Sequence, residues 1–180
     1  MNIKFSGKNL LFKNSSISML IKRDVKAISS DEYDVVVALD QTEASNKVIS
    51  NPGEYEINDI LVYAVDTTNN LQPDSIVFDF EGIKVIYLSA EKDLNVEKIL
   101  ENVSICDIVI AEINEENFLK QIDNINEIEP NMVIPLVDND VLLEKTKKEF
   151  GGMPEAKTTI KVSSSDFTQE DRPTILEILK

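Results

Sequence analysis

The 180-residue chain contains no histidine and no tryptophan, and its only cysteine is Cys106. Imidazole is a usual zinc ligand and a frequent general base near neutral pH, and a hydrolytic zinc site needs three protein ligands. A lone cysteine cannot form a disulfide within the chain, and here it has no histidine to activate it as a nucleophile. Any metal site would therefore be built from carboxylates, which favour harder ions such as Mg²⁺, Ca²⁺ or Mn²⁺.

Basic residues are also scarce, because 18 Lys and Arg stand against 33 Asp and Glu, for a formal net charge of −15. This charge repels phosphate backbones and anionic membrane surfaces, so we expect no binding to nucleic acid or to membranes. The sequence has no long apolar run and no signal-like start, which predicts a soluble, cytoplasmic protein. The length and the apolar content of 42% predict one domain, residues 1–180, with a sizeable core.

The first half of the sequence predicts strands. Residues 1–28 alternate short apolar runs with turn residues, as in a meander of antiparallel strands. We predict an apolar strand at 34–39, a polar corner at 40–46, a short strand, a turn at Pro52-Gly53, and a strand pair that ends at Val65. Strands then continue to residue 80, with one clear loop at 67–73.

The second half alternates strands with helices. Apolar runs typical of buried strands occupy 83–88, 106–111 and 132–136, and shorter strands are predicted at 158–162 and 174–179. Apolar residues recur at helical spacing in 94–103, 115–128 and about 139–150. Strands first, followed by alternating strands and helices, favour an α/β sandwich of two sheets with helices on the outer faces.

A doubly wound open sheet built on residues 83–162 is the competing fold. Its nucleotide-binding form needs a glycine-rich loop after the first strand, so that the backbone can approach a pyrophosphate. The corresponding segment, Ser89–Asp93, contains no glycine, so the sequence favours the sandwich.

The segment 51–57, NPGEYEI, resembles the PGEYE signature of small Zn-dependent hydrolases of the metallo-β-lactamase fold superfamily. Two later segments resemble the same family in the same order. The strand pair at 75–88 is similar to the family hairpin that leads to a Gly-Asp metal motif, and IEPNMVIP at 128–135 resembles the strand that runs into a metal-binding His. The resemblance covers about residues 30–137 and implies an αββα sandwich of two mixed sheets.

The same resemblance implies that this chain lacks the family's metal ligands. Alignment on Asp34 and the PGEYE turn assigns the four ligand positions of the family's HxHxDH corner to Leu39, Gln41, Glu43 and Ala44. A further His position falls near Thr67 or Thr68, the bridging Asp falls at Ala90, and the last His falls at Val137. In the corner only Glu43 keeps a group that could bind a metal, so no intact ligand set remains.

Three hypotheses about function follow. The first is a pseudoenzyme: a non-catalytic scaffold or regulatory binding protein without cofactor, which pairs with another protein or with itself. The second is a divalent-metal-dependent hydrolase that uses carboxylates around Asp40, Glu43 and Asp138. The third is a small-molecule binder that uses the relic cleft. Acidic charge alone points only weakly to a site in a chain with 33 acidic residues, so we favour the first.

The alignment also predicts what replaces the metal. Leu39, Ala44, Ala90 and Val137 are expected to converge at one end of the two sheets, with Glu43 at the rim. Cys106 is expected to be a small core residue, because the neighbouring Asp107 disfavours a thiolate.

Overall fold

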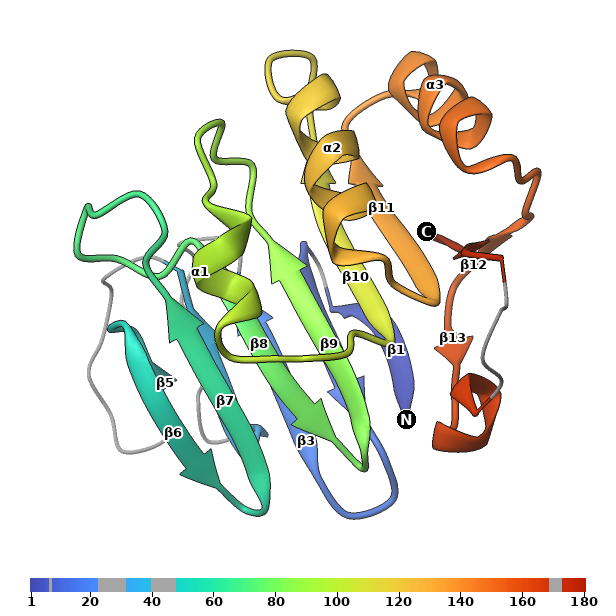
Figure 1. Ribbon diagram of the computed structural model, residues 1–180. Helices are drawn as coiled ribbons and strands as arrows, with labels where there is room; N and C mark the ends of the chain where they lie inside the picture. Colours follow the sequence, from blue (N-terminus) through green and yellow to red (C-terminus); the bar gives the residue numbers. More distant parts are fainter. Residues whose placement is uncertain (7, 23–31, 40–47, 169–172) are drawn as a thin grey trace.

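A computed structural model describes residues 1–6, 8–22, 32–39, 48–168 and 173–180, and in it two mixed β-sheets pack face to face (Figure 1). The first sheet has the order β13-β1-β2-β3-β4-β5. Its strands are β1 (Asn2–Ser6), β2 (Asn9–Lys13), β3 (Ser18–Lys22), β4 (Val35–Ala38), β5 (Val48–Ile49) and β13 (Ile160–Lys161).

The second sheet has the order β14-β11-β10-β9-β8-β7-β6. Its strands are β6 (Gly53–Ile57), β7 (Ile60–Val65), β8 (Ser75–Phe80), β9 (Ile83–Leu88), β10 (Ile108–Ile113), β11 (Met132–Val137) and β14 (Ile175–Leu176). The strands from β6 to β9 pair antiparallel, and those from β9 to β14 pair parallel. A separate parallel pair joins β12 (Ala156–Lys157) to β15 (Ile178–Leu179).

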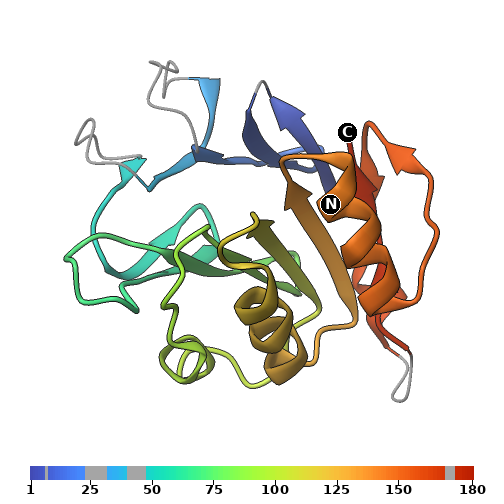
Figure 2. The same cartoon turned by 90° about the horizontal axis from the view of Figure 1, so that it is seen from above.

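The helices lie beside the second sheet. They are α1 (Val96–Leu100), α2 (Phe118–Ile128) and α3 (Asp140–Phe150), with a short 3₁₀ turn at Ser164–Phe167. Figure 2 shows α1 and α2 against the face of this sheet that points away from β1–β3. The two packed sheets confirm the predicted sandwich. A doubly wound sheet has helices on both faces, but here the first sheet packs on one face of the second, so the alternative fold is wrong. In the described ranges, no helix combines the length and the apolar character needed to cross a bilayer.

Two apolar clusters explain the long apolar runs of the sequence. In β10, Ile108 and Ile110 belong to the core between the sheets, whereas Val109 and Ala111 belong to the cluster beneath the helices. Successive side chains of a strand point to opposite faces, so a strand covered on both faces is apolar at every position.

Several predicted boundaries shift in the structure. The predicted helix at 94–103 is shorter because the side chain of Asn95 accepts from the Lys98 amide at its start, and the Asn102 side chain donates to the Lys98 carbonyl at its end. The predicted last strand at 174–179 is two short strands, because β14 pairs with β11 and β15 pairs with β12. α3 agrees with the predicted helix at about 139–150: the Asn139 side chain accepts from the Leu142 amide at its start, and Gly151 at its end has φ +68°.

The Pro52-Gly53 turn is a corner between β5 of the first sheet and β6 of the second. The Tyr55 hydroxyl donates a 2.9 Å hydrogen bond back to the Asn51 carbonyl, and a side chain at position 53 would lie 3.4 Å from the Tyr55 ring. Gly53 also has φ +153°, which L residues rarely adopt. The geometry of the corner therefore explains Gly53 and Tyr55 of the PGEYE segment.

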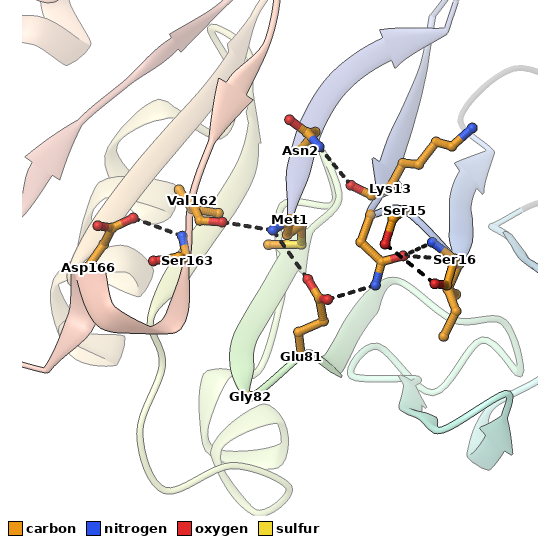
Figure 3. A network of polar contacts seen from close by, with 12 residues as sticks. Met1, Asn2, Lys13, Ser15, Ser16, Glu81, Gly82, Val162, Ser163 and Asp166 are labelled. Carbon is orange, nitrogen blue, oxygen red and sulfur yellow. Dashed lines mark hydrogen bonds and ion pairs between the residues drawn. The ribbon is translucent and has the colours of Figure 1, made fainter.

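Polar contacts join the two sheets near the turn between β8 and β9 (Figure 3). The amino nitrogen of Met1 lies 2.8 Å from the Val162 carbonyl oxygen and 3.3 Å from Oε2 of Glu81. Asn14, in the turn between β2 and β3, donates a 2.8 Å hydrogen bond to Oε1 of the same carboxylate. One glutamate thus holds the second sheet against two segments of the first.

Candidate functional site

The parallel strands β9, β10 and β11 end at one edge of the second sheet, and in α/β sheets ligands bind outside such carboxyl ends. Ala90 follows β9, and Val137 ends β11, where it pairs with Ile113 of β10. The two relic positions therefore lie at the same edge with one strand between them, about 10 Å apart at the usual strand spacing. Both are half-buried.

The other relic positions belong to the first sheet or its connections. Leu39 follows β4 and packs against the core between the sheets. Gln41, Glu43 and Ala44 lie outside the described residues, as does Asp40 of the carboxylate hypothesis. The convergence of Leu39, Ala44, Ala90 and Val137 therefore stays a prediction.

Glu112 is a polar residue of this edge that the sequence analysis did not single out. It follows Ile108 and Ile110 on the inward phase of β10, so its carboxylate points to the space between the sheets. The hydroxyl of the buried Tyr87 donates a 2.5 Å hydrogen bond to Oε1 of Glu112. Glu112 pairs with Leu136, next to Val137, so its carboxylate belongs to the edge that carries both relic positions.

Amide side chains from the start of α2 fix the loops of this edge. Gln121 donates from Nε2 to the carbonyls of Ser89 (2.7 Å) and Glu112 (3.2 Å). Asn117 donates from Nδ2 to the carbonyls of Ala90 (3.0 Å) and Glu112 (3.1 Å). Both residues are at most 1% exposed, so their buried side-chain amides are satisfied by these backbone carbonyls. We call Asn117, Gln121 and Asn124, which donates to Oε1 of Gln121, the amide network.

Thr67 and Thr68, near the predicted His position, are held by a carboxylate. Oδ2 of the buried Asp74 accepts from both backbone amides, at 2.9 and 3.0 Å, and from the Thr68 hydroxyl at 3.0 Å. The Asp74 carbonyl in turn accepts from the Ser89 amide at 3.1 Å. Asp74 thereby ties the loop after β7 to the loop after β9, next to the amide network.

A groove of about 630 Å³ lies beside this edge. Val137, Asp138, Asn139 and Asp140 line one side of it, where β11 leads into α3. The rest of the lining comes from Phe5, Lys8, Pro135, Leu136, Leu143, Ala156, Ile178, Leu179 and Lys180. Its wall combines polar and apolar surface in similar amounts and carries charges of both signs, which does not select one class of ligand.

The donor groups of the chain do not fit a zinc centre at this edge. The chain has no histidine, and its single cysteine precedes β10, at the end of that strand opposite to Glu112. Cys106 is 4% exposed, and burial raises the pKa of its thiol, with the nearby charge of Asp107 adding to the rise. The predicted role of Cys106 as a small core residue is confirmed by this burial.

Carboxylates do not assemble a metal site in the part of the chain that is described. No group of three His, Cys, Asp or Glu side chains there is close enough to hold an ion. Glu91 and Asp93 are exposed after β9, Asp138 and Asp140 are exposed at the start of α3, and Glu54 and Glu56 lie on the far strand β6.

No protein-family model and no curated protein matches the sequence. Solved structures do match. A protein from Thermotoga maritima, assigned as a Zn-dependent hydrolase of the metallo-β-lactamase superfamily, is 16% identical with a TM-score of 0.73 over 99% of both chains. The metallo-β-lactamase fold protein YhfI from Bacillus subtilis is 10% identical with a TM-score of 0.62, over 96% of this chain and 88% of its own.

A third structure, from Parabacteroides distasonis and assigned as a metal-dependent hydrolase, is 12% identical with a TM-score of 0.58. The match covers 96% of this chain and 90% of the other. At these identities the likeness shows a shared fold. The chain thus has the metallo-β-lactamase fold, as the PGEYE resemblance implied.

Proposed function

We propose that this protein keeps the metallo-β-lactamase fold without the metal chemistry and works as a non-catalytic binding or regulatory protein for another protein. The observation that carries the proposal is the absence of histidine from all 180 residues. A hydrolytic zinc ion needs three protein ligands and an open position for water, and imidazole or thiolate groups supply most such ligands.

The edge where a metal would sit supports the same conclusion. Ala90 and Val137 lie at that edge without a metal-binding group, the Val137 side chain packs against the apolar cluster beneath the helices, and the one thiol lies at the opposite end of β10. The amide network and Asp74 hold the loops after β7, β9 and β10 by hydrogen bonds. Protein side chains therefore contribute to positioning these loops.

The alternative is a hydrolase with a carboxylate-based metal site, and an experiment must distinguish it from the non-catalytic protein. It requires Asp40 and Glu43 to act with Asp138, and Asp138 is an exposed residue at the entrance of α3. Such a site would prefer Mg²⁺, Mn²⁺ or Ca²⁺ to Zn²⁺ because its ligands would all be oxygens.

Metal analysis and thermal unfolding test the proposal. Protein purified without chelator should contain no stoichiometric zinc, and millimolar Zn²⁺, Mn²⁺, Mg²⁺ or Ca²⁺ should leave the melting temperature within about 1 °C. An ion present at 100 times its Kd would stabilise the native state by about 2.7 kcal/mol, or roughly 5–10 °C for a chain of this size. One or two bound ions per chain, lost in Glu43→Gln but kept in the control Glu115→Gln, would refute the proposal.

A further inference from the structure

The strand β6 (Gly53–Ile57) ends the seven-stranded sheet. It pairs with β7 on one side, and no other strand of the described ranges pairs with it. An edge strand presents a row of backbone donors and acceptors that a further extended chain can use.

The hairpin turn decides which backbone groups of β6 face outward. Asn58 and Asp59 have φ values of +51° and +62°, as in a two-residue type I′ turn, and Ile57 pairs with Ile60 across it. Residues that flank such a turn exchange both backbone hydrogen bonds, and bonded and non-bonded pairs then alternate along the hairpin. The amides and carbonyls of Glu54 and Glu56 therefore point to the free edge.

The two faces of β6 differ in chemistry. Tyr55 and Ile57 are half-buried and pack against the core between the sheets. Glu54 and Glu56 are exposed on the other face, where the hydroxyl of Tyr63 donates to Glu54 at 3.4 Å. In a strand added to this edge, every second side chain would lie beside Tyr55 and Ile57. The side chains between them would lie beside the carboxylates of Glu54 and Glu56.

Charge selects the partner. Residues 48–83 contain no Lys or Arg, and three acidic residues of the β6–β7 hairpin, Glu54, Glu56 and Asp59, are exposed. Antiparallel pairing of β6 with a second copy would bring Glu54 and Glu56 against the same glutamates of that copy, and like charges directly opposite each other destabilise a strand pair. The edge therefore disfavours self-pairing and favours a basic strand.

We propose that β6 is the docking strand for an extended segment of a partner protein in which basic side chains alternate with apolar ones. The segment pairs with the outward backbone groups of Glu54 and Glu56, and its basic side chains lie beside these two carboxylates. The inference rests on the proposed function, because it names the class of partner that a non-catalytic binding protein of this fold would take.

Binding of a synthetic nine-residue peptide, in which Lys alternates with Val or Thr, tests the proposal. Calorimetry at 0.15 M salt should show binding to the wild-type chain and about tenfold weaker binding to Glu54→Gln/Glu56→Gln, since two opposite-charge cross-strand pairs are lost. The control Glu115→Gln/Glu116→Gln changes the net charge equally at two exposed residues before α2 and should bind within about twofold of wild type.

A second peptide separates strand pairing from charge attraction. Methylation of alternate backbone nitrogens keeps every lysine and removes the amide donors, so it should abolish binding. Equal weakening in both double variants, equal binding of the methylated peptide, or no binding of the first peptide would each refute the docking strand. A wild-type dimer that Glu56→Pro dissociates, by removing an outward backbone donor of β6, would also refute it, because the edge would then belong to a second copy.

The two proposals fail separately. If the peptide does not bind and metals leave the melting temperature unchanged, the docking proposal is refuted and the proposed non-catalytic function stands. Specific stabilisation by a metal would instead remove the non-catalytic function, whatever the peptide does.

Discussion

The hydroxyl of Tyr87, buried in β9, donates a 2.5 Å hydrogen bond to Oε1 of Glu112 at the end of β10. Hydrogen bonds to a carboxylate contribute more to stability than bonds between neutral groups. This pair joins the core between the sheets to the edge that carries Ala90 and Val137.

Tyr87→Phe keeps the ring and removes this donor, so we expect the free energy of unfolding to fall by about 1.5–3 kcal/mol in urea denaturation. Tyr33→Phe is the matched control, because its hydroxyl makes a 3.4 Å contact to Ser6. It should change stability by less than about 0.5 kcal/mol. If the free energy of unfolding fell by similar amounts in the two variants, the hydrogen bond to Glu112 would contribute no more to stability than the Tyr33–Ser6 contact.

Gln121→Ala should destabilise the protein by about 2–4 kcal/mol. The substitution removes a buried side chain that donates to the carbonyls of Ser89 and Glu112, and it opens a cavity under α2. Lys120→Ala, an exposed change on the same helix, should stay within about 0.5 kcal/mol of wild type. Urea unfolding followed by circular dichroism compares the two, and equal stability of both variants would contradict the structural role of the amide network.

The helices and strands of the second half of the chain could be predicted because their capping residues and apolar patterns agree with the burial that the fold requires. Asn139 and Gly151 bound α3 in the sequence as in the structure, and the apolar run of β9 fits a strand covered on both faces. The division of the last strand into β14 and β15 could not be predicted. Alternation of side chains along a strand indicates its two faces but not the neighbouring strand with which each residue pairs. Glu177 lies at that division, where its amide donates to the Val133 carbonyl.

The candidate site was predicted only in part. Its position at the strand ends follows from the resemblance, but Glu112 was missed because an acidic residue at a strand end suggests exposure to solvent. The inward phase of Ile108, Ile110 and Glu112 was the available signal. The amide network was missed likewise, although Asn117, Gln121 and Asn124 recur at helical spacing and mark a buried polar stripe.

Gly53→Ala should cost more than Gly82→Ala. At position 53 the backbone has φ +153° and a Cβ would meet the Tyr55 ring at 3.4 Å, whereas at position 82 φ is +77° and nothing lies within 4 Å. We expect losses of about 2–3 kcal/mol and about 1 kcal/mol respectively, measured by chemical denaturation. The reverse order would show that the corner is less constrained than its geometry indicates.

Asp107 gives the stability a pH dependence of known sign. Burial raises the pKa of its carboxyl above 3.8, against the opposing effect of the hydrogen bond from the Lys84 amide. The folded state therefore holds this proton more tightly than the unfolded chain, and the associated stability is lost as pH rises through the folded pKa. Asp107→Asn removes this titration, so its stability relative to wild type should increase from pH 4 to pH 7 in urea titrations. A constant difference would contradict the assignment.

The side chains of the amide network are neutral throughout the range in which proteins are folded, and they do not depend on a bound ion. In a metal-dependent fold, the free energy of metal binding becomes part of the free energy of folding, so the folded population varies with metal supply and acidity. Here Gln121 and Asn117 hold the loops after β9 and β10 with groups that respond to neither variable. This edge should keep its shape in chelator and in metal-poor cells, so that the amount of usable protein is set by its synthesis and degradation.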